Sequence, residues 1–398
     1  MKKILLVNKF YYYRGGDCTA TLSLEKLLKK HGHEVAIFSS RHPKNLPSKW
    51  ERYFPSEIDL SSPSFKNIFS ALTRPFFPRE VKRKFLQLVH DFEPDIIHVH
   101  NIHSYLSPYI VKLATDKGIK VIWTLHDFKL ICPAYNCLRD GKPCELCFTD
   151  KTNVIKHKCF KKSLKASVVA YLEAIIWNRR KLEKQTETFV SPSHFLKSKM
   201  EFAGFHKSKI KVLHNFIQTE NLPPCSSHKE DYYCYVGRLS PEKGIDSLLK
   251  AAKELPYSLY LIGGGDESYR VKKEYVKENI HFLGHQPLDE VMRIISKARF
   301  TVIPSICYEN NPFSVIESLC AGTPVLGANI GGIPELIEEG KSGFLFTPGD
   351  TEELKQKITD CFQTFDDSYP FQDIADKARE KFSANMFYEQ LCNIYGIQ

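Results

Sequence analysis

Two carboxylates, Glu309 and Glu317, stand close together in the second half of the chain. An apolar run at residues 300–304 ends shortly before them, and a helix-like run begins at residues 314–320. Glu309 is therefore expected in a strand-to-helix loop and Glu317 about one turn into the helix, facing the same cleft. An open α/β sheet binds its ligands outside the carboxyl ends of its strands. The acid pair thus predicts a ligand-binding site at this edge.

Two cations follow the first strand-like run of the second half. Arg238 and Lys243 belong to the segment Gly-Arg-Leu-Ser-Pro-Glu-Lys-Gly at residues 237–244, which joins that strand to a helix. Arg offers a fork of donors, Lys a point charge, and a helix N-terminus adds backbone donors, a combination that suits a pyrophosphate. A basic turn is the alternative for this loop alone, and the nearby acid pair favours phosphate binding.

Two further strand ends lie in the first half. Gly15 and Gly16 follow the first strand, where a backbone can approach a phosphate or sugar closely. They match neither a dinucleotide-binding fingerprint nor a P-loop, and by themselves they favour a simple turn. His126 follows the strand expected at residues 120–125 and could contact a ligand there, whereas a lone histidine is more often structural.

A cysteine cluster occupies a long stretch without a regular pattern. Cys132, Cys144, Cys147 and Cys159 can wrap one tetrahedral Zn²⁺, which leaves Cys137 as the surplus thiol. Such a stretch needs a staple to be ordered. Four thiolates without an open position indicate a structural zinc and argue against a catalytic one. Free or redox-active thiols are the alternative.

The order of elements predicts an α/β protein with two domains. Strand-like and helix-like runs alternate along the chain, the pattern of parallel α/β layers. A polar, Pro-containing stretch at residues 218–228 separates two halves, and 398 residues suffice for two cores. We expect two open α/β domains with a cleft between them. The expected strands cover residues 3–7, 34–38, 95–100, 120–125, 188–191, 211–213, 232–236, 258–262, 280–282, 301–303, 324–326 and 344–346. The expected helices include residues 19–30, 80–92, 106–115, 164–183, 244–253, 288–297, 314–320 and 351–364.

The two halves differ in charge. Residues 1–213 hold 38 Lys and Arg against 19 Asp and Glu, a net charge of +19, whereas residues 214–398 hold 18 against 27, a net charge of −9. A basic half fits an anionic membrane, a phosphorylated acceptor or nucleic acid, or is a solvated surface. Its basic residues are scattered over several helices and form no nucleic-acid-binding module, so nucleic acid is not expected as a partner.

Two stretches of the basic half, residues 65–85 and 157–184, mix bases with large apolar residues. Both could dock on an anionic bilayer. For the second we favour a helix that turns its apolar face to the core. No apolar run reaches the length of a membrane span, and residues 4–7 are too short for a signal peptide, so a cytosolic protein is expected. The apolar residues at helical spacing in the second stretch are Leu164, Val168, Leu172, Ile175 and Ile176.

These motifs together resemble the retaining glycosyltransferases of family 4, which have the two-domain GT-B fold. The resemblance covers nearly the full length. It implies an N-terminal acceptor-side domain over residues 1–213 and a C-terminal nucleotide-sugar-binding domain over residues 214–378. The final helix, within residues 379–398, is then expected to pack on the first domain. The motifs that carry the resemblance are the paired acids, the segment 237–244, Gly15-Gly16, Thr-Leu-His-Asp at 124–127, Val-Leu-His-Asn-Phe at 212–216 and Gly-Gly-Ile-Pro-Glu at 331–335.

The resemblance also implies roles for the site residues. Glu317 would bind the ribose hydroxyls of a nucleotide sugar, and Arg238 and Lys243 would hold its diphosphate. His126 would touch the sugar from the first domain. Gly15 and Gly16 would pass close to the diphosphate, and the donor sugar would be held by Glu309 with the backbone of Asn310, Asn311, Pro312, Phe313 and Ser314.

The expected activity is transfer of a sugar, with retention, from a nucleotide-diphosphate donor (a UDP-sugar is favoured) to a lipid-linked oligosaccharide or glycan acceptor. The expected place is the inner face of the cytoplasmic membrane. Cations and helix N-termini can stabilise the leaving diphosphate, so no catalytic metal is expected. The alternatives are a nucleotide-sugar epimerase or hydrolase, which would release nucleotide without an acceptor, and a zinc-containing nucleic-acid-binding protein.

Overall fold

The computed structural model describes residues 1–58, 73–226 and 228–397. The chain divides into two compact units. The first unit comprises Met1–Cys137, Cys144–Leu213 and Tyr388–Gln398, and the second comprises Leu138–Pro143 and His214–Phe387. The main segment of the second unit begins at His214, shortly before the Pro-containing stretch at residues 218–228. Part of the basic stretch at residues 65–85 lies outside the described residues.

The first unit is built on a six-stranded parallel sheet in the order β2-β1-β3-β4-β7-β8. The side chains of its central strands are almost wholly buried, as expected for a parallel sheet covered on both faces. The chain adds β2 on one side of β1 and then returns to add β3 on the other, which places a topological switch point between β1 and β3. The strands are β1 (Lys3–Val7), β2 (Glu34–Phe38), β3 (Ile96–Val99), β4 (Lys120–Thr124), β7 (Thr188–Ser191) and β8 (Ile210–Val212).

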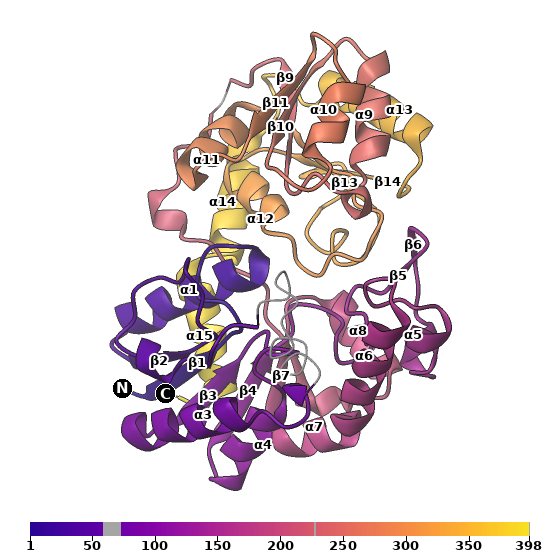
Figure 1. Cartoon of the computed structure of the whole chain (residues 1–398). Helices are drawn as coiled ribbons and strands as arrows, with labels where there is room; N and C mark the ends of the chain where they lie inside the picture. Colours follow the sequence, from indigo (N-terminus) through magenta and orange to yellow (C-terminus); the bar gives the residue numbers. More distant parts are fainter. Residues whose placement is uncertain (59–72, 227, 398) are drawn as a thin grey trace. The chain divides into compact units, whose positions relative to one another are not determined.

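Helices flank this sheet (Figure 1). The helix expected over residues 164–183 is wrong in one respect, because it breaks after Ile176. Asn178 starts a new helix there by accepting a hydrogen bond from the Lys181 backbone through its side chain. The helices are α1 (Gly16–Lys30), α3 (Arg79–Phe92), α4 (Tyr109–Asp116), α5 (Asn153–Lys156), α6 (Leu164–Ile176), α7 (Arg179–Gln185), α8 (His194–Phe202) and α15 (Ala384–Tyr395).

The second unit repeats this plan with a parallel sheet in the order β11-β10-β9-β12-β13-β14. Here the switch point lies between β9 and β12. The two sheets confirm the predicted α/β class, and each of the twelve expected strands is present with bounds shifted by at most two residues. The strands are β9 (Tyr232–Val236), β10 (Ser258–Ile262), β11 (Ile280–Gly284), β12 (Thr301–Ile303), β13 (Val325–Ala328) and β14 (Gly343–Phe346). The helices are α9 (Ile245–Glu254), α10 (Ser268–Glu274), α11 (Leu288–Lys297), α12 (Phe313–Cys320), α13 (Thr351–Thr364) and α14 (Phe371–Lys381).

The last helix, α15, packs on the first unit through two tyrosines. The Tyr388 hydroxyl lies 2.7 Å from His33 Nε2, and the Tyr395 hydroxyl lies 2.6 Å from His98 Nδ1. Lys120 Nζ also donates to the Tyr395 carbonyl at 2.9 Å. The segment that joins the first unit starts at Tyr388, within α15, rather than at residue 379.

The cysteine-rich stretch has some regular structure of its own. A short antiparallel hairpin of β5 (Leu138–Arg139) and β6 (Lys142–Pro143) precedes α5. Among the helices of the described ranges, none combines the length and the apolar character that crossing a membrane requires.

Candidate functional site

In the second unit, the predicted residues gather at the carboxyl ends of β9 and β12. These two strands are neighbours in the sheet and flank its switch point. Arg238 and Lys243 follow β9, and Glu309 follows β12. Ligands of open α/β sheets bind at such a place. The topology therefore brings together the cations and the first acid, which sequence order separates.

Lys243 and Glu309 form an ion pair. Lys243 Nζ donates to Glu309 Oε1 at 2.5 Å, and Ser305 Oγ donates to the same oxygen at 2.6 Å. Burial opposes ionisation of Glu309, but the Lys243 charge and the two hydrogen bonds outweigh it and hold the pKa of Glu309 below its ordinary value. The same pairing overcomes burial at Lys243 and raises the pKa of its ammonium. Both groups are charged at neutral pH.

Two glycines allow the loops around this pair to approach each other. Gly244 has φ 71°, and a Cβ there would lie 1.8 Å from the Pro304 carbonyl oxygen, next to Ser305. Gly331 has φ 64°, and a Cβ there would lie 2.4 Å from the Glu309 carbonyl oxygen. Only a residue without a side chain fits either place. The segment 331–335 is thus anchored on the backbone of Glu309.

Glu317 has a different environment from Glu309. It lies on α12, and within the described ranges no Lys or Arg forms an ion pair with it. Burial alone raises the pKa of its carboxyl to about 7. A largely desolvated carboxyl without a cationic partner is suited to bind hydroxyl groups of a ligand.

Arg238 lies on the outer part of the loop. Its side chain is 68% exposed, and Nη2 lies 3.0 Å from Glu242 Oε1. An exposed pair of this kind is weak, at most about 1 kcal/mol. The guanidinium can therefore exchange this partner for a phosphate, whereas Lys243 is held in place.

Asn311 contacts Asn215 and His214 near the start of the second unit. Its side-chain oxygen accepts from the Asn215 backbone at 2.7 Å, and its carbonyl accepts from Asn215 Nδ2 at 2.8 Å. Its amide also lies 3.2 Å from His214 Nδ1. These contacts attach the start of the second unit to the loop.

Pro312 precedes α12, whose first turn has no side-chain cap, so the backbone donors of Phe313 and Ser314 are not used by a cap.

In the first unit, Gly15 and Gly16 stand at the N-terminus of α1. Gly15 is the N-cap residue in an extended conformation, Gly16 is the first helical residue, and no side chain caps this end. The loop that precedes them leaves the carboxyl end of β1, beside the switch point. A helix N-terminus at this position is an anion-binding arrangement.

His126 follows β4 and has several neighbours that the sequence did not identify. Its Nε2 lies 2.9 Å from His100 Nδ1. Burial lowers the pKa of His126, while the negative charges of Asp17 and Asp127 act in the opposite direction. Asn101 Nδ2 lies 3.3 Å from Asp17 Oδ2 and 3.4 Å from Asp127 Oδ2, so it joins both carboxylates. The motif His-Val-His-Asn at residues 98–101, which spans the end of the buried strand β3, was the available signal.

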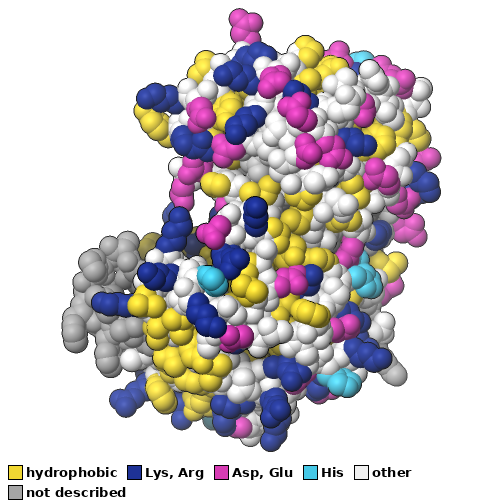
Figure 2. Space-filling view, turned by 90° about the vertical axis from the view of Figure 1, so that its right-hand side faces the viewer, with side chains coloured by type: hydrophobic (Ala, Val, Ile, Leu, Met, Phe, Trp, Pro, Cys, Tyr) yellow, Lys and Arg dark blue, Asp and Glu magenta, His cyan; other side chains and the backbone are white. Residues whose placement is uncertain are grey.

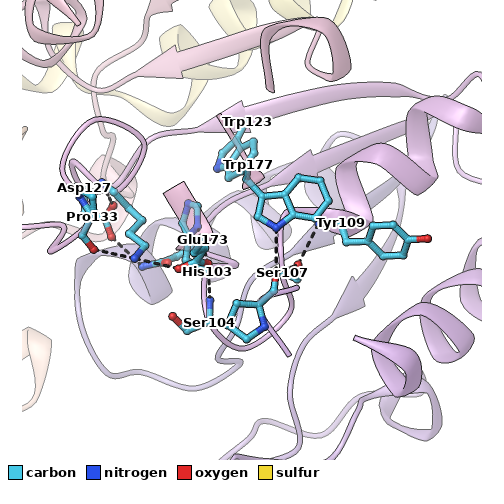
Figure 3. Close-up of polar contacts among 12 residues, drawn as sticks. His103, Ser104, Ser107, Tyr109, Trp123, Asp127, Pro133, Glu173 and Trp177 are labelled. Carbon is cyan, nitrogen blue, oxygen red and sulfur yellow. Dashed lines mark hydrogen bonds and ion pairs between the residues drawn. The ribbon is translucent and has the colours of Figure 1, made fainter. Parts of the chain in front are cut away.

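A buried ionic cluster holds the loop after His126 against α6 (Figure 3). Asp127 accepts a hydrogen bond from the Lys129 backbone at 2.8 Å. Lys129 Nζ then reaches the Pro133 carbonyl at 2.8 Å and Glu173 Oε2 at 3.0 Å. His103 Nδ1 lies 3.4 Å from the other oxygen of Glu173. Burial opposes ionisation of Glu173, but Lys129 and His103 lower its pKa to about 2, so it remains charged.

The cysteines assemble differently from the predicted set. The thiols of Cys137 and Cys147 hydrogen-bond to the Cys132 sulfur, which lowers the pKa of Cys132. The same contacts and burial raise the pKa of Cys137 and of Cys147. Cys137, which was expected to be the surplus thiol, therefore belongs to this hydrogen-bonded cluster with Cys132 and Cys147. Cys144 is partly exposed. No disulfide joins any of the twelve cysteines, and among the described residues no group of three or more His, Cys, Asp or Glu is arranged to hold a metal. The structural zinc stays a prediction.

Two family profiles match the sequence and together cover most of it. Glycosyltransferase Family 4 matches residues 15–221, and Glycosyl transferases group 1 matches residues 220–370. An uncharacterized 42.6 kDa protein in the cps region of Klebsiella pneumoniae is 26% identical over 98% of this chain and 99% of its own length. The amylovoran biosynthesis glycosyltransferase AmsK of Erwinia amylovora is 27% identical over 54% of this chain and 57% of its own length.

The structure is also similar to a solved one over its whole length. HepE of Anabaena, solved in complex with UDP and glucose, superposes with a TM-score of 0.68 at 17% identity. The superposition covers 100% of both chains. At this level of identity the likeness establishes a shared fold.

Proposed function

The chain belongs to Glycosyltransferase Family 4, and we propose that it transfers a sugar, with retention of anomeric configuration, from a nucleoside diphosphate sugar to a cell-surface glycan precursor. Its two Rossmann-like domains are those of the GT-B fold. We propose a UDP-sugar as the donor, in line with the UDP and glucose bound by HepE. The name of AmsK, an amylovoran biosynthesis glycosyltransferase, supports a role in polysaccharide synthesis.

The observation that carries this proposal is the ion pair of Lys243 and Glu309 at the switch point of the second unit. It leaves a fixed ammonium and a charged carboxylate side by side at a sheet edge, with the exposed guanidinium of Arg238 on the same loop as Lys243. A diphosphate needs the two cations, and a sugar hydroxyl needs the carboxylate. We assign the diphosphate to Lys243 and Arg238 and the sugar to Glu309.

Glu317 completes the donor site as the residue that binds the ribose. Its raised pKa and the lack of an ion pair within the described ranges favour hydroxyl groups over a cation. The first turn of α12 supplies backbone N–H groups for the sugar, since no side chain caps it. We propose that Gly16 at the N-terminus of α1 and His126 after β4 serve the same donor from the first unit.

The chemistry follows from these charges. The bond between the anomeric carbon and the diphosphate oxygen breaks as negative charge grows on the phosphate, which the cations and helix N-termini stabilise without a metal. Glu309 faces the sugar, where positive charge develops. We propose that the acceptor hydroxyl attacks from the face that the diphosphate leaves, and that the leaving phosphate oxygen takes its proton.

We further propose that the first unit binds the inner face of the cytoplasmic membrane through α6. This helix buries its small and polar residues, Ser167, Ala170 and Glu173, and exposes large apolar ones. Leu164 is 51% exposed, Leu172 42% and Ile175 44%. The expectation that this face points to the core is therefore wrong. The physical reason is Glu173, whose pairing with Lys129 turns that side of α6 inward.

Charge complements this apolar face. Lys161, Lys162 and Lys165 are exposed around the start of α6, and Arg180 and Lys181 are exposed after its end. Figure 2 shows hydrophobic side chains gathered on the first unit with Lys and Arg side chains around them. An apolar strip between basic ends is the arrangement that binds an anionic bilayer surface. A lipid-linked acceptor would be presented at such a surface.

Membrane binding is testable by sedimentation with vesicles of phosphatidylglycerol or of phosphatidylcholine. We expect the protein to sediment with the anionic vesicles and to be released by salt. Replacing Leu172 and Ile175 by Ser should abolish this binding. Leu288→Ser, which alters a 64% exposed leucine of α11 in the second unit, is the matched control. Equal sedimentation of all three proteins would exclude α6 as the contact.

The activity itself is tested in two steps. A thermal-shift screen of UDP-, GDP- and ADP-sugars identifies the donor, because a ligand that binds only the folded state raises the unfolding temperature. Nucleotide release is then measured with and without glycan or lipid-linked acceptors. Release that depends on an acceptor supports transfer. Equal release without any acceptor would identify a hydrolase or an epimerase instead.

A further inference from the structure

Three histidine rings lie in a column at the carboxyl end of the first sheet. The centroids of the His98 and His100 rings are 4.6 Å apart, and those of His100 and His126 are 5.2 Å apart, with interplanar angles of 20° in both cases. A hydrogen bond of 2.9 Å joins His100 Nδ1 to His126 Nε2. His98 uses both of its ring nitrogens, on the Tyr395 and Thr124 hydroxyls.

The proton in the bond between His100 and His126 belongs to one of two ring nitrogens. Burial lowers the pKa of both histidines, and the neighbouring His98 and His126 rings lower the pKa of His100 further. Each ring is therefore neutral at pH 7 and carries one N–H proton. If His126 Nε2 donated the proton, the proton of His100 would sit on its own Nε2. That atom is buried and has no hydrogen-bond partner among the described residues. A buried N–H group without an acceptor is rare and unfavourable.

We propose that His100 is a positioning residue whose Nδ1–H donates to His126 Nε2 and thereby fixes His126 with its proton on Nδ1. In this arrangement the unpartnered Nε2 of His100 carries no proton, and no buried donor is left without an acceptor. His126 is thus a fixed hydrogen-bond donor.

The consequence rests on the proposed function, in which His126 touches the donor sugar. An N–H group fixed at Nδ1 can donate a hydrogen bond to an acceptor oxygen of the sugar. A ring that populated both tautomers would present this donor in only a fraction of the molecules. His100 therefore acts on the sugar through His126 and does not contact the nucleotide. Its loss should weaken turnover and leave the affinity for UDP alone unchanged.

The proton position can be observed without any activity measurement. Long-range ¹H–¹⁵N correlation spectra of the full chain, labelled with ¹⁵N-histidine, distinguish a protonated ring nitrogen from an unprotonated one. The His126 signals are identified by their loss in His126→Gln. We expect Nδ1 of His126 to be protonated and Nε2 to be unprotonated. The opposite pattern in the wild-type protein would overturn the proposal, whatever reaction the protein catalyses.

Two variants of His100 separate positioning from packing. His100→Asn keeps an N–H donor near the place of Nδ1, whereas His100→Leu fills the space without a donor. We expect the leucine variant to show both tautomers of His126 and about tenfold lower kcat with an unchanged Kd for UDP, and the asparagine variant to restore both readings. His33→Leu, at a histidine that contacts Tyr388, is the control. Wild-type kcat in the leucine variant would contradict the proposal, and the wild-type spectrum decides the case if that variant does not fold.

Discussion

Lys243 and Glu309 stand 66 positions apart in the sequence, and their Nζ and Oε1 atoms lie 2.5 Å apart in the structure. The pair joins the loop after β9 to the loop after β12, the two strands at the switch point of the second sheet. Because Ser305 donates to the same carboxylate oxygen, the geometry of the pair is fixed before a ligand arrives. Such preorganisation is what a site for a charged donor requires.

The ion pair predicts an asymmetry in stability. Lys243→Met leaves the mostly buried carboxylate of Glu309 without its cation and should lower the free energy of unfolding by about 3 kcal/mol. Adding Glu309→Gln to this variant removes the unpaired charge and should restore most of the loss. Urea denaturation of both variants measures the difference. Arg238→Met, at a 68% exposed side chain, is the control and should change stability by less than about 0.5 kcal/mol. Equal stability of the single and double variants would contradict a paired carboxylate.

Glu317 predicts a dependence of stability on pH. Its pKa is raised from 4.5 to about 7 by burial, so the folded state holds the proton more tightly than the unfolded state. The contribution of Glu317 to stability therefore falls as the pH rises from 4.5 to about 7 and is constant above that. The free energy of unfolding of Glu317→Gln, whose side chain cannot ionise, should rise relative to that of the wild type by up to about 3 kcal/mol over this pH window. A constant difference between the two proteins from pH 4.5 to pH 8 would show that Glu317 is not desolvated.

The ribose assignment predicts a separate kinetic effect for Glu317. Glu317→Ala should raise the KM for the nucleotide sugar and weaken UDP binding, while kcat changes little, because the ribose contact is equally strong in ground and transition states. Steady-state kinetics and titration with UDP measure the two effects. A large fall in kcat at unchanged KM would assign Glu317 to the reacting sugar instead.

The cysteine arrangement predicts which thiols matter for the fold. Cys137 is buried against Cys132, whereas Cys144 is partly exposed. If the cluster binds zinc, the purified protein should carry the metal, and Cys137→Ser should lose it with a lower unfolding temperature, while Cys144→Ser keeps it. Elemental analysis and thermal unfolding with and without a chelator test this. Metal-free protein with the same unfolding temperature with and without the chelator would show that the cluster consists of structural thiols. Loss of zinc from Cys144→Ser but not from Cys137→Ser would support the four ligands expected from the sequence.

The strands were predictable because buried parallel strands are continuous apolar runs between loops, as residues 3–7 and 301–303 show. The site was predictable where a charged residue lies in the loop that follows such a run, as Lys243 and Glu309 do. Contacts between segments that lie far apart in the sequence were not predictable. The turn of Asn311 toward Asn215, and the bond between His100 and His126, depend on which loops become neighbours.

The outward face of α6 was missed for a related reason. A helix with apolar residues at helical spacing is ordinarily assumed to bury them. Glu173 is buried instead, because Lys129 and His103 from other segments compensate its charge. The sequence shows one acid within an apolar helix, and only the folded chain shows its partners.

The most direct measurement of the central claim compares transfer and nucleotide binding in Glu309→Gln. With the donor found by thermal shift, the substitution should lower kcat by about a hundredfold or more, because the charge that faces the developing positive sugar is lost. UDP, which lacks the sugar, should bind with nearly unchanged affinity, since Lys243 and Arg238 remain. Near-normal turnover of Glu309→Gln, with UDP bound as in the wild type, would contradict the assignment of Glu309 to the transferred sugar.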